Sequence, residues 1–146
     1  MSSTEVVGLH VCLIDDDPDH VLLISRAIRE VAGETTVQAI DDGAAALAAL
    51  RQAEESPDLI LLDINMAGLS GFDVLVELKA DERLRRTPVV MLTSSELPAD
   101  IMRAYELGAS GYISKPSYLH DLRAVLGNTL LYWSAMKRPS EGSETA

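Results

Sequence analysis

The chain has 146 residues, a formal net charge of −11 at pH 7 and a single cysteine, Cys12. This length predicts one domain over residues 9–137, with flexible ends at 1–8 and 138–146. The acidic balance excludes a nucleic-acid partner, because a nucleic-acid-binding face needs clustered basic residues. No apolar run approaches the roughly 20 residues that cross a membrane, and one cysteine excludes a disulfide scaffold. We therefore expect a protein of the reducing cytoplasm that makes no membrane contact.

Short apolar runs alternate along the chain with segments of helical periodicity. The expected strands cover residues 11–15, 35–40, 58–63, 88–93 and 111–114. The expected helices cover about 18–31, 44–54, 72–78, 98–107 and 118–137. Strands that alternate with helices indicate βαβ units, and hence an α/β fold with a parallel sheet.

Capping and turn residues mark the ends of these helices. Asp17 followed by Pro18 is typical of a helix start, and we expect Ser117 to cap the last helix. Pro57 ends the second helix, because the residue before a proline disfavours helical geometry. Gly108 follows the fourth helix, at the place where a left-handed C-terminal cap commonly falls.

Four of the expected strands end on polar side chains that can do chemistry. Asp15 and Asp16 follow the first strand, Asp63 ends the third, Thr93 ends the fourth and Lys115 follows the fifth. In an open parallel sheet, ligands bind at the carboxyl ends of the strands. We therefore expect three carboxylates, a hydroxyl and an ammonium at one edge of the sheet.

This set of groups fits a divalent cation and a phosphoryl group. Three close carboxylates repel one another and favour a hard cation such as Mg²⁺. An aspartate can act as a nucleophile and form an aspartyl phosphate, while Lys115 neutralises one phosphoryl oxygen and Thr93 donates to another. The three histidines share no metal-ligand spacing, and we expect His10, His20 and His120 to be surface or packing residues.

With these residues in this order, the chain resembles the receiver domains of two-component response regulators, from about residue 10 to residue 133. The likeness rests on four segments: Leu-Ile-Asp15-Asp16-Asp17, Leu-Leu-Asp63-Ile-Asn65-Met, Met-Leu-Thr93-Ser94-Ser95 and Gly-Tyr112-Ile-Ser-Lys115-Pro116. The resemblance implies a flavodoxin-like, three-layer α/β/α fold. Its five parallel strands would lie in the order 2-1-3-4-5, with helices on both faces of the sheet.

The resemblance also implies an acceptor and a metal site. Asp63 would be the phosphoacceptor. Asp16, Asp63 and the backbone carbonyl of Asn65 would hold Mg²⁺, with Asp15 acting partly through water. Such a protein is not an enzyme with a separate substrate, because it catalyses only its own phosphorylation and dephosphorylation.

Further roles follow from the same resemblance. Thr93 and Lys115 would bind the phosphoryl group, and Thr93 and Tyr112 would form the switch pair. Lys115 and Pro116 would be joined by a cis peptide bond, which is essentially a proline phenomenon. The chain departs from the family at Ala67, where a proline is usual.

The last third of the chain narrows the likeness to single-domain regulators paired with bacterial phytochromes. The segments that carry it run from Thr87 to Ser95, from Asp100 to Gly108 and from Tyr112 to Pro116, with Tyr132-Trp133 near the end. The implied partner is a sensor histidine kinase, which in this subgroup is a light-sensing bacteriophytochrome. No output domain follows in the sequence, so we expect the chain to act by docking to another protein or by relaying phosphoryl groups.

Two alternatives stay open. A Mg²⁺-dependent phosphohydrolase with an aspartyl nucleophile would carry an Asp-x-Asp pattern after its first strand, which Asp15 and Asp17 match. The chain is short for the substrate cap of such an enzyme, and the usual hydroxyl just after that pattern is missing. A degenerate receiver used only for binding is the other alternative, which the five intact site positions disfavour. Turnover of phosphate esters would favour the hydrolase, and single-turnover labelling of Asp63 would favour the receiver.

The last helix is apolar over a wider arc than its own core contact needs. One stripe, which we assign to the core, consists of Leu119, Leu122, Leu126, Leu130 and Trp133. A second set repeats every four and three residues and consists of Tyr118, Leu122, Val125, Thr129, Tyr132 and Met136. Beside Ile101, Tyr105 and Tyr112, this set would form an exposed contact face that phosphorylation reshapes. We predict a homodimer or a kinase-docking site there.

Overall fold

The computed structural model describes residues 8–136, which form a five-stranded parallel sheet in the order β2-β1-β3-β4-β5. The strands are β1 (His10–Ile14), β2 (Thr36–Ile40), β3 (Leu59–Leu62), β4 (Val89–Thr93) and β5 (Gly111–Ser114). The helices are α1 (Pro18–Val31), α2 (Gly43–Gln52), α3 (Gly71–Ala80), α4 (Pro98–Glu106) and α5 (Leu119–Ala135), with a short 3₁₀ helix, η1 (Leu84–Arg86). The expected strand order and alternation are confirmed. The predicted flexible tail 138–146 and all but Gly8 of the predicted flexible start lie outside the described residues.

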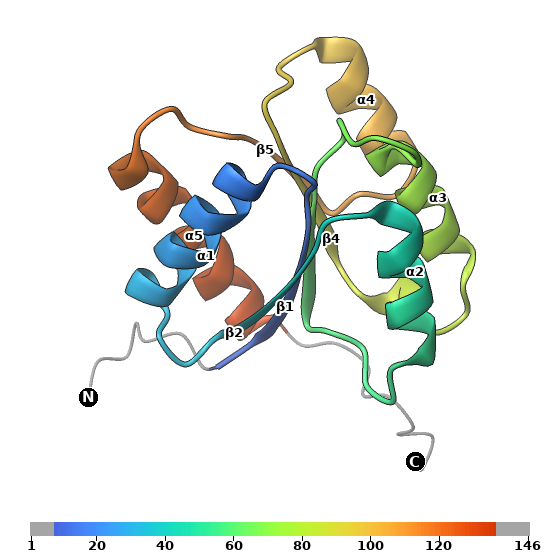
Figure 1. Ribbon diagram of the computed structural model, residues 1–146, viewed down its shortest axis with the longest axis horizontal. Coiled ribbons are helices and arrows are strands. Elements are labelled where there is room, and N and C mark those ends of the chain that lie inside the picture. Colours follow the sequence, from blue (N-terminus) through green and yellow to red (C-terminus); the bar gives the residue numbers. More distant parts are fainter. Residues whose placement is uncertain (1–7, 137–146) are drawn as a thin grey trace.

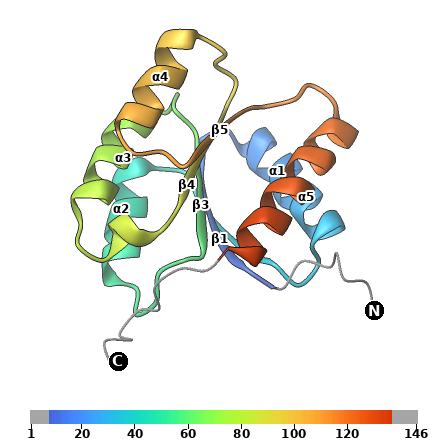
Figure 2. The same ribbon diagram turned by 180° about the vertical axis from the view of Figure 1, so that it is seen from behind.

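Helices cover both faces of the sheet, as Figures 1 and 2 show from opposite sides. α1 and α5 pack together on one face, and α2, α3 and α4 lie on the other. The predicted three-layer architecture is therefore confirmed.

Alternation along the strands divides the core into two clusters. In β1, Val11 and Leu13 pack against α1 and α5, while Cys12 and Ile14 pack toward α2 and α3. Successive side chains of a strand point to opposite faces, so a strand covered on both sides must be apolar at every position. β3 satisfies this condition completely, because its Leu-Ile-Leu-Leu run is fully buried.

The capping predictions hold at two of three positions. Asp17 caps α1, where its side chain accepts hydrogen bonds from the backbone N–H groups of Asp19 and His20. Gly108 has φ of +106° after α4, the left-handed geometry expected there. The prediction for Ser117 is wrong, because the chain is still extended at Tyr118 and α5 begins at Leu119 without a side-chain cap.

Two further expectations are corrected. The Lys115–Pro116 peptide bond is trans, because no cis peptide bond occurs within residues 8–136; trans is the lower-energy form of a peptide bond before proline. Leu122 is buried in the cluster between α1 and α5, so it belongs to the core stripe and is not available on a partner face.

No helix within the described part of the chain is long and apolar enough to cross a membrane.

Candidate functional site at the carboxyl edge of the sheet

Asp15 and Asp63 converge on the ammonium group of Lys115. Ile14 of β1 pairs with Leu62 of β3, so the two aspartates that follow these residues lie side by side. Lys115 Nζ lies 2.7 Å from Asp15 Oδ2 and 3.2 Å from Asp63 Oδ2. All three side chains are at most 8% exposed, so the buried carboxylates have a cation between them. Such pairing is what allows charged groups to stay buried.

Backbone N–H groups orient the two carboxylates. Oδ1 of Asp15 accepts from the N–H of Asp17 at 2.9 Å, and Oδ1 of Asp63 accepts from the N–H of Asn65 at 3.4 Å. The N–H of Asp63 in turn donates to the carbonyl of Ile14 at 3.0 Å, which ties Asp63 to β1. Asp15 is therefore held by short bonds at both oxygens, whereas Oδ1 of Asp63 has one long bond.

Asp16 lies apart from this pair. Its Oδ2 accepts a hydrogen bond of 2.9 Å from the backbone N–H of Ala67, in the loop before α3. Within residues 8–136, no three acidic, histidine or cysteine side chains converge as a ready metal-binding group. The predicted ligand residues therefore share one edge of the sheet without forming a preassembled cage.

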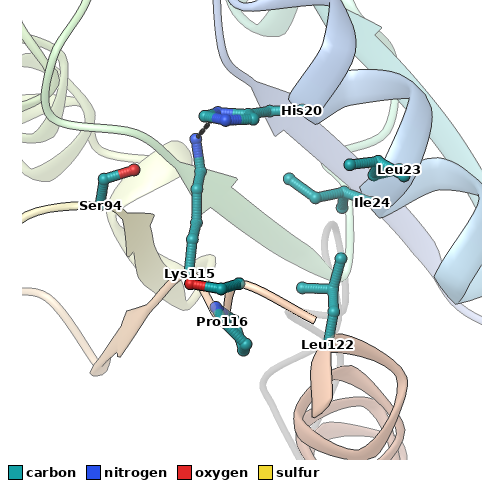
Figure 3. Close-up of a pocket in the computed structure, with 8 residues that line it drawn as sticks. His20, Leu23, Ile24, Ser94, Lys115, Pro116 and Leu122 are labelled. Carbon is teal, nitrogen blue, oxygen red and sulfur yellow. Dashed lines mark hydrogen bonds between the residues drawn. The ribbon is translucent and has the colours of Figure 1, made fainter. Parts of the chain in front are cut away.

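Lys115 has a third partner, His20, which was expected to be a surface or packing residue. Nδ1 of His20, on the first turn of α1, lies 2.8 Å from Lys115 Nζ, and Figure 3 marks this contact with a dashed line. An ammonium has three N–H donors, and those of Lys115 therefore have three acceptors: Asp15, Asp63 and His20. No spacing in the sequence could reveal this contact, because it joins side chains 95 positions apart.

Asp17, which caps α1, also contacts His20. Asp17 Oδ2 lies 3.4 Å from Nδ1 of His20. Partial desolvation acts to raise the pKa of Asp17, but hydrogen bonds from the backbone N–H groups of His20 and Asp19, together with nearby positive charge, lower the pKa below its usual value. Asp17 is thus an anion beside the imidazole.

Ser95 links the predicted switch pair, Thr93 and Tyr112. Thr93 is fully buried, and its Oγ1 accepts from the N–H of Ser95 at 3.4 Å. The hydroxyl of the half-buried Tyr112 donates to the carbonyl of Ser95 at 2.9 Å. Oγ of Ser95 donates to Asp100 Oδ2 in the first turn of α4 at 2.6 Å. Thr93 and Tyr112 are thus joined to α4 through Ser95, a residue to which the sequence assigned no role of its own.

Gly71 is a second residue with an unrecognised role. It begins α3, and its N–H donates to the carbonyl of Ile64 at 2.8 Å. A Cβ at this position would overlap the backbone oxygen of Asp63. Only glycine therefore allows α3 to start so close to Asp63.

The predicted partner face is partly exposed. This face is formed by α4, β5 and α5, and Figure 2 shows β5 between these two helices. Ile101, Tyr112 and Val125 are half-buried. The exposed members are Tyr105, Tyr118, Tyr132 and Met136, with Tyr118 the most exposed at 71%.

The family model of the response regulator receiver domain matches residues 11–127. The chain is 34% identical to the probable methanogenesis regulatory protein FilR2 of Methanothrix harundinacea, over 88% of this chain and 85% of FilR2. It is also 34% identical to the response regulator Rcp1 of Synechocystis sp., over 82% of this chain and 92% of Rcp1.

Solved structures show the same likeness in three dimensions. The structure superposes with a TM-score of 0.84 on the phosphorylated cyanobacterial phytochrome response regulator RcpA, at 33% identity, covering 92% of this chain and all of RcpA. For the Mn²⁺-bound form of Rcp1 the TM-score is 0.80 at 30% identity, covering 90% of this chain and 99% of Rcp1.

Proposed function

The chain belongs to the response regulator receiver family, and from this premise we propose that it accepts a phosphoryl group from a sensor histidine kinase on Asp63. The observation that carries the proposal is the convergence of Asp63, Asp15 and Lys115 at the carboxyl edge of the sheet. In the transfer, a carboxylate oxygen of Asp63 forms a bond to phosphorus. The bond from phosphorus to the donor's imidazole nitrogen breaks, and its electron pair stays with that nitrogen.

The surroundings of the two buried aspartates favour Asp63 as the nucleophile. Asp15 is fully buried, with one oxygen bonded to Lys115 at 2.7 Å and the other to the N–H of Asp17 at 2.9 Å. Asp63 has longer contacts of 3.2 Å and 3.4 Å, so its oxygens are less firmly engaged. A hydrolase of the Asp-x-Asp type would use Asp15 as its nucleophile, and the firm engagement of Asp15 argues against that alternative.

Lys115 and Thr93 are proposed to bind the phosphoryl group after transfer. Lys115 already contacts Asp63, so its ammonium is in place to neutralise an oxygen on the new group. Thr93 ends β4, and the backbone N–H of Lys115 donates to its carbonyl at 2.8 Å, so both residues lie at the same edge of the sheet. A rotation of Thr93 toward the phosphoryl group would alter its hydrogen bond with Ser95. Because Ser95 also bonds Tyr112 and Asp100, the change would reach Tyr112 and α4.

A divalent cation, which we propose to be Mg²⁺, fits the donor set at this edge. Asp15, Asp16, Asp63 and the backbone carbonyl of Asn65 offer the hard oxygen ligands that this ion prefers, and Asp16 would have to leave the N–H of Ala67. When bound, the ion would neutralise negative charge on the transferring group. The Mn²⁺-bound form of the related Rcp1 supports a divalent cation as a ligand of this chain.

A bacteriophytochrome-type histidine kinase is the proposed partner. RcpA, a cyanobacterial phytochrome response regulator, superposes on 92% of this chain and supports the assignment. We propose that the face over α4, β5 and α5 mediates homodimer formation or kinase docking, since its exposed side chains include three tyrosines and a methionine. The net charge of −11 argues against a nucleic-acid partner.

The decisive experiment is labelling with acetyl phosphate and Mg²⁺, followed by intact-mass analysis. One phosphoryl group should be added, as an acyl phosphate that is stable in acid and labile in base. Asp63→Asn should abolish the label, and Asp41→Asn, which removes the same charge after the edge strand β2, should keep it. Labelling of Asp63→Asn at the parental level would refute the acceptor assignment. Repeated turnover of a small phosphate ester that depends on Asp15 would favour the hydrolase.

A further inference from the structure

His20 and Lys115 meet in a small pocket beside the proposed acceptor. The pocket, with a volume of about 230 Å³, lies between α1 and the segment that joins β5 to α5, and Figure 3 shows its lining. The other lining residues are Leu23, Ile24, Ser94, Pro116, Ser117 and Leu122, which carry no charge. The imidazole and the ammonium are thus the only basic groups in the lining of this pocket.

The chemistry of Lys115 fixes the state of His20 in this contact. An ammonium has donors and no acceptor, so Nδ1 of His20 must accept the hydrogen bond of 2.8 Å. An accepting Nδ1 carries no proton, so the ring is neutral and its proton lies on Nε2. The contact with Lys115 therefore requires His20 to be the neutral tautomer with its proton on Nε2.

A second partner of the same nitrogen requires the opposite state. Asp17 Oδ2 lies 3.4 Å from Nδ1, and a carboxylate can receive a hydrogen bond from this atom only when Nδ1 carries a proton. Two charged groups thus contact the imidazole, Lys115 from the end of β5 and Asp17 from the start of α1, with Asp15 and Asp63 beyond Lys115. The two contacts of Nδ1 exclude each other.

On these grounds we infer that His20 is a positioning residue for Lys115. As the neutral Nε2–H tautomer, it accepts the third N–H of the ammonium and holds that group against Asp15 and Asp63. With a proton on Nδ1 it would donate to Asp17 instead, and the hydrogen bond from Lys115 would be lost. Phosphoryl transfer to Asp63 would accordingly weaken when His20 cannot accept from Lys115. The expected effect of His20 on phosphoryl transfer rests on the proposed function. The hydrogen bond between His20 and Lys115 does not depend on that function.

The first test reads the tautomer directly. Long-range ¹H–¹⁵N NMR of the imidazole of His20 in the full chain, at about pH 8 and without phosphodonor, should show the proton on Nε2 and none on Nδ1. The exposed His120, which lies beside Asp121, serves as the reference ring in the same spectrum. A proton on Nδ1 of neutral His20 would overturn the inference. This measurement decides the contact even if the protein takes up no phosphoryl group, an outcome that would refute the proposed function instead.

The second test compares initial rates of Asp63 labelling by acetyl phosphate with Mg²⁺. His20→Ala should slow labelling roughly tenfold at about pH 8, the scale of one lost hydrogen bond to a charged group. His20→Gln offers an uncharged acceptor and should recover most of the rate. Recovery by His20→Gln but not by His20→Ala would show that the group needed at this position is a hydrogen-bond acceptor for Lys115.

The control for the second test is His120→Gln, the same substitution at an exposed position of α5. It should be labelled at the parental rate. Circular dichroism would establish that each variant is folded. A His20→Ala rate equal to that of His120→Gln, or a His20→Gln rate as low as that of His20→Ala, would overturn the inference while leaving the acceptor assignment intact.

Discussion

The backbone N–H of Ala67 donates to Oδ2 of Asp16 over 2.9 Å, although the two residues are 51 positions apart. This bond holds a proposed metal ligand against the loop before α3. A proline, which is usual at this position in the family, has no N–H and could not make it. The departure noted in the sequence thus has a structural consequence at the proposed cation site.

Asp16→Asn should remove most of the response of the protein to Mg²⁺. A ligand that binds only the native state stabilises it by RT ln(1 + [L]/Kd), about 1–2 kcal/mol at roughly ten times Kd. Thermal unfolding with and without Mg²⁺ measures this effect. Asp41→Asn is the charge-matched control and should respond like the parent. Equal Mg²⁺ responses in the parent and Asp16→Asn would show that Asp16 is not a ligand.

Ala67→Pro should strengthen Mg²⁺ binding, because Asp16 would no longer have to leave the N–H of Ala67. The expected gain is roughly fivefold in Kd, about 1 kcal/mol, for the loss of one competing hydrogen bond. A Mg²⁺ titration followed by thermal unfolding gives the apparent Kd. Ala67→Ser retains the N–H and should bind Mg²⁺ like the parent. The same Kd in both variants would mean that the bond does not restrain Asp16.

Gly71→Ala should destabilise the protein and slow labelling of Asp63. The added Cβ would overlap the backbone oxygen of Asp63 and lie 2.7 Å from Cα of Ile64, so backbone must move. Overpacking of this kind costs about 1–3 kcal/mol, which urea unfolding would measure. Gly127→Ala is the control, since its Cβ would meet Val31 at an ordinary 3.7 Å and should be neutral or stabilising. Two variants of equal stability would contradict the close approach at Gly71.

Val125→Glu combined with Tyr132→Glu should weaken self-association without affecting the labelling of Asp63 by acetyl phosphate. Both positions lie on α5, where a carboxylate would be buried by any contact across this face. Multi-angle light scattering measures the oligomeric state. Leu22→Glu with Val76→Glu places the same charges on exposed positions of α1 and α3 and serves as the control. If Val125→Glu with Tyr132→Glu remains a dimer while the control pair does not, the dimer interface lies elsewhere. If the parent is a monomer, kinase docking is the remaining role for this face.

Cys12 should be inert in the native state, and its burial should make stability fall at high pH. Desolvation raises the pKa of the Cys12 thiol from 9.0 to about 12. Between these pKa values the folded protein keeps the proton of the Cys12 thiol, whereas the unfolded chain loses it. The contribution of the buried thiol to the free energy of unfolding is therefore complete below about pH 9 and declines between about pH 9 and 12. Urea unfolding at several pH values should show a steeper decline for the parent than for Cys12→Ala. Equal slopes, or rapid reaction of the native thiol with a disulfide reagent, would contradict this prediction.

The order of elements and the edge of the sheet that carries the site could be predicted from the sequence. Apolar runs such as residues 59–62 can be buried only when both faces of a strand are covered, which requires helices on both sides of a parallel sheet. The placement of Asp15, Asp63 and Lys115 at one edge follows from the same logic, because all strands of such a sheet end on one side. Local signals also placed Asp17 at a helix start and Gly108 after a helix end.

Contacts between distant side chains and backbone groups depended on tertiary structure. The bonds of His20 to Lys115 and of Ala67 to Asp16 join segments with no common periodicity, so no pattern in the chain encodes them. The burial of Leu122 was decided in the same way, since that side chain lies on both apolar arcs of α5 and only the packing of α1 against α5 assigns it to the core. Periodicity determines which residues share a face of one element, whereas the distance between two elements, set by how they pack, decides which side chains touch.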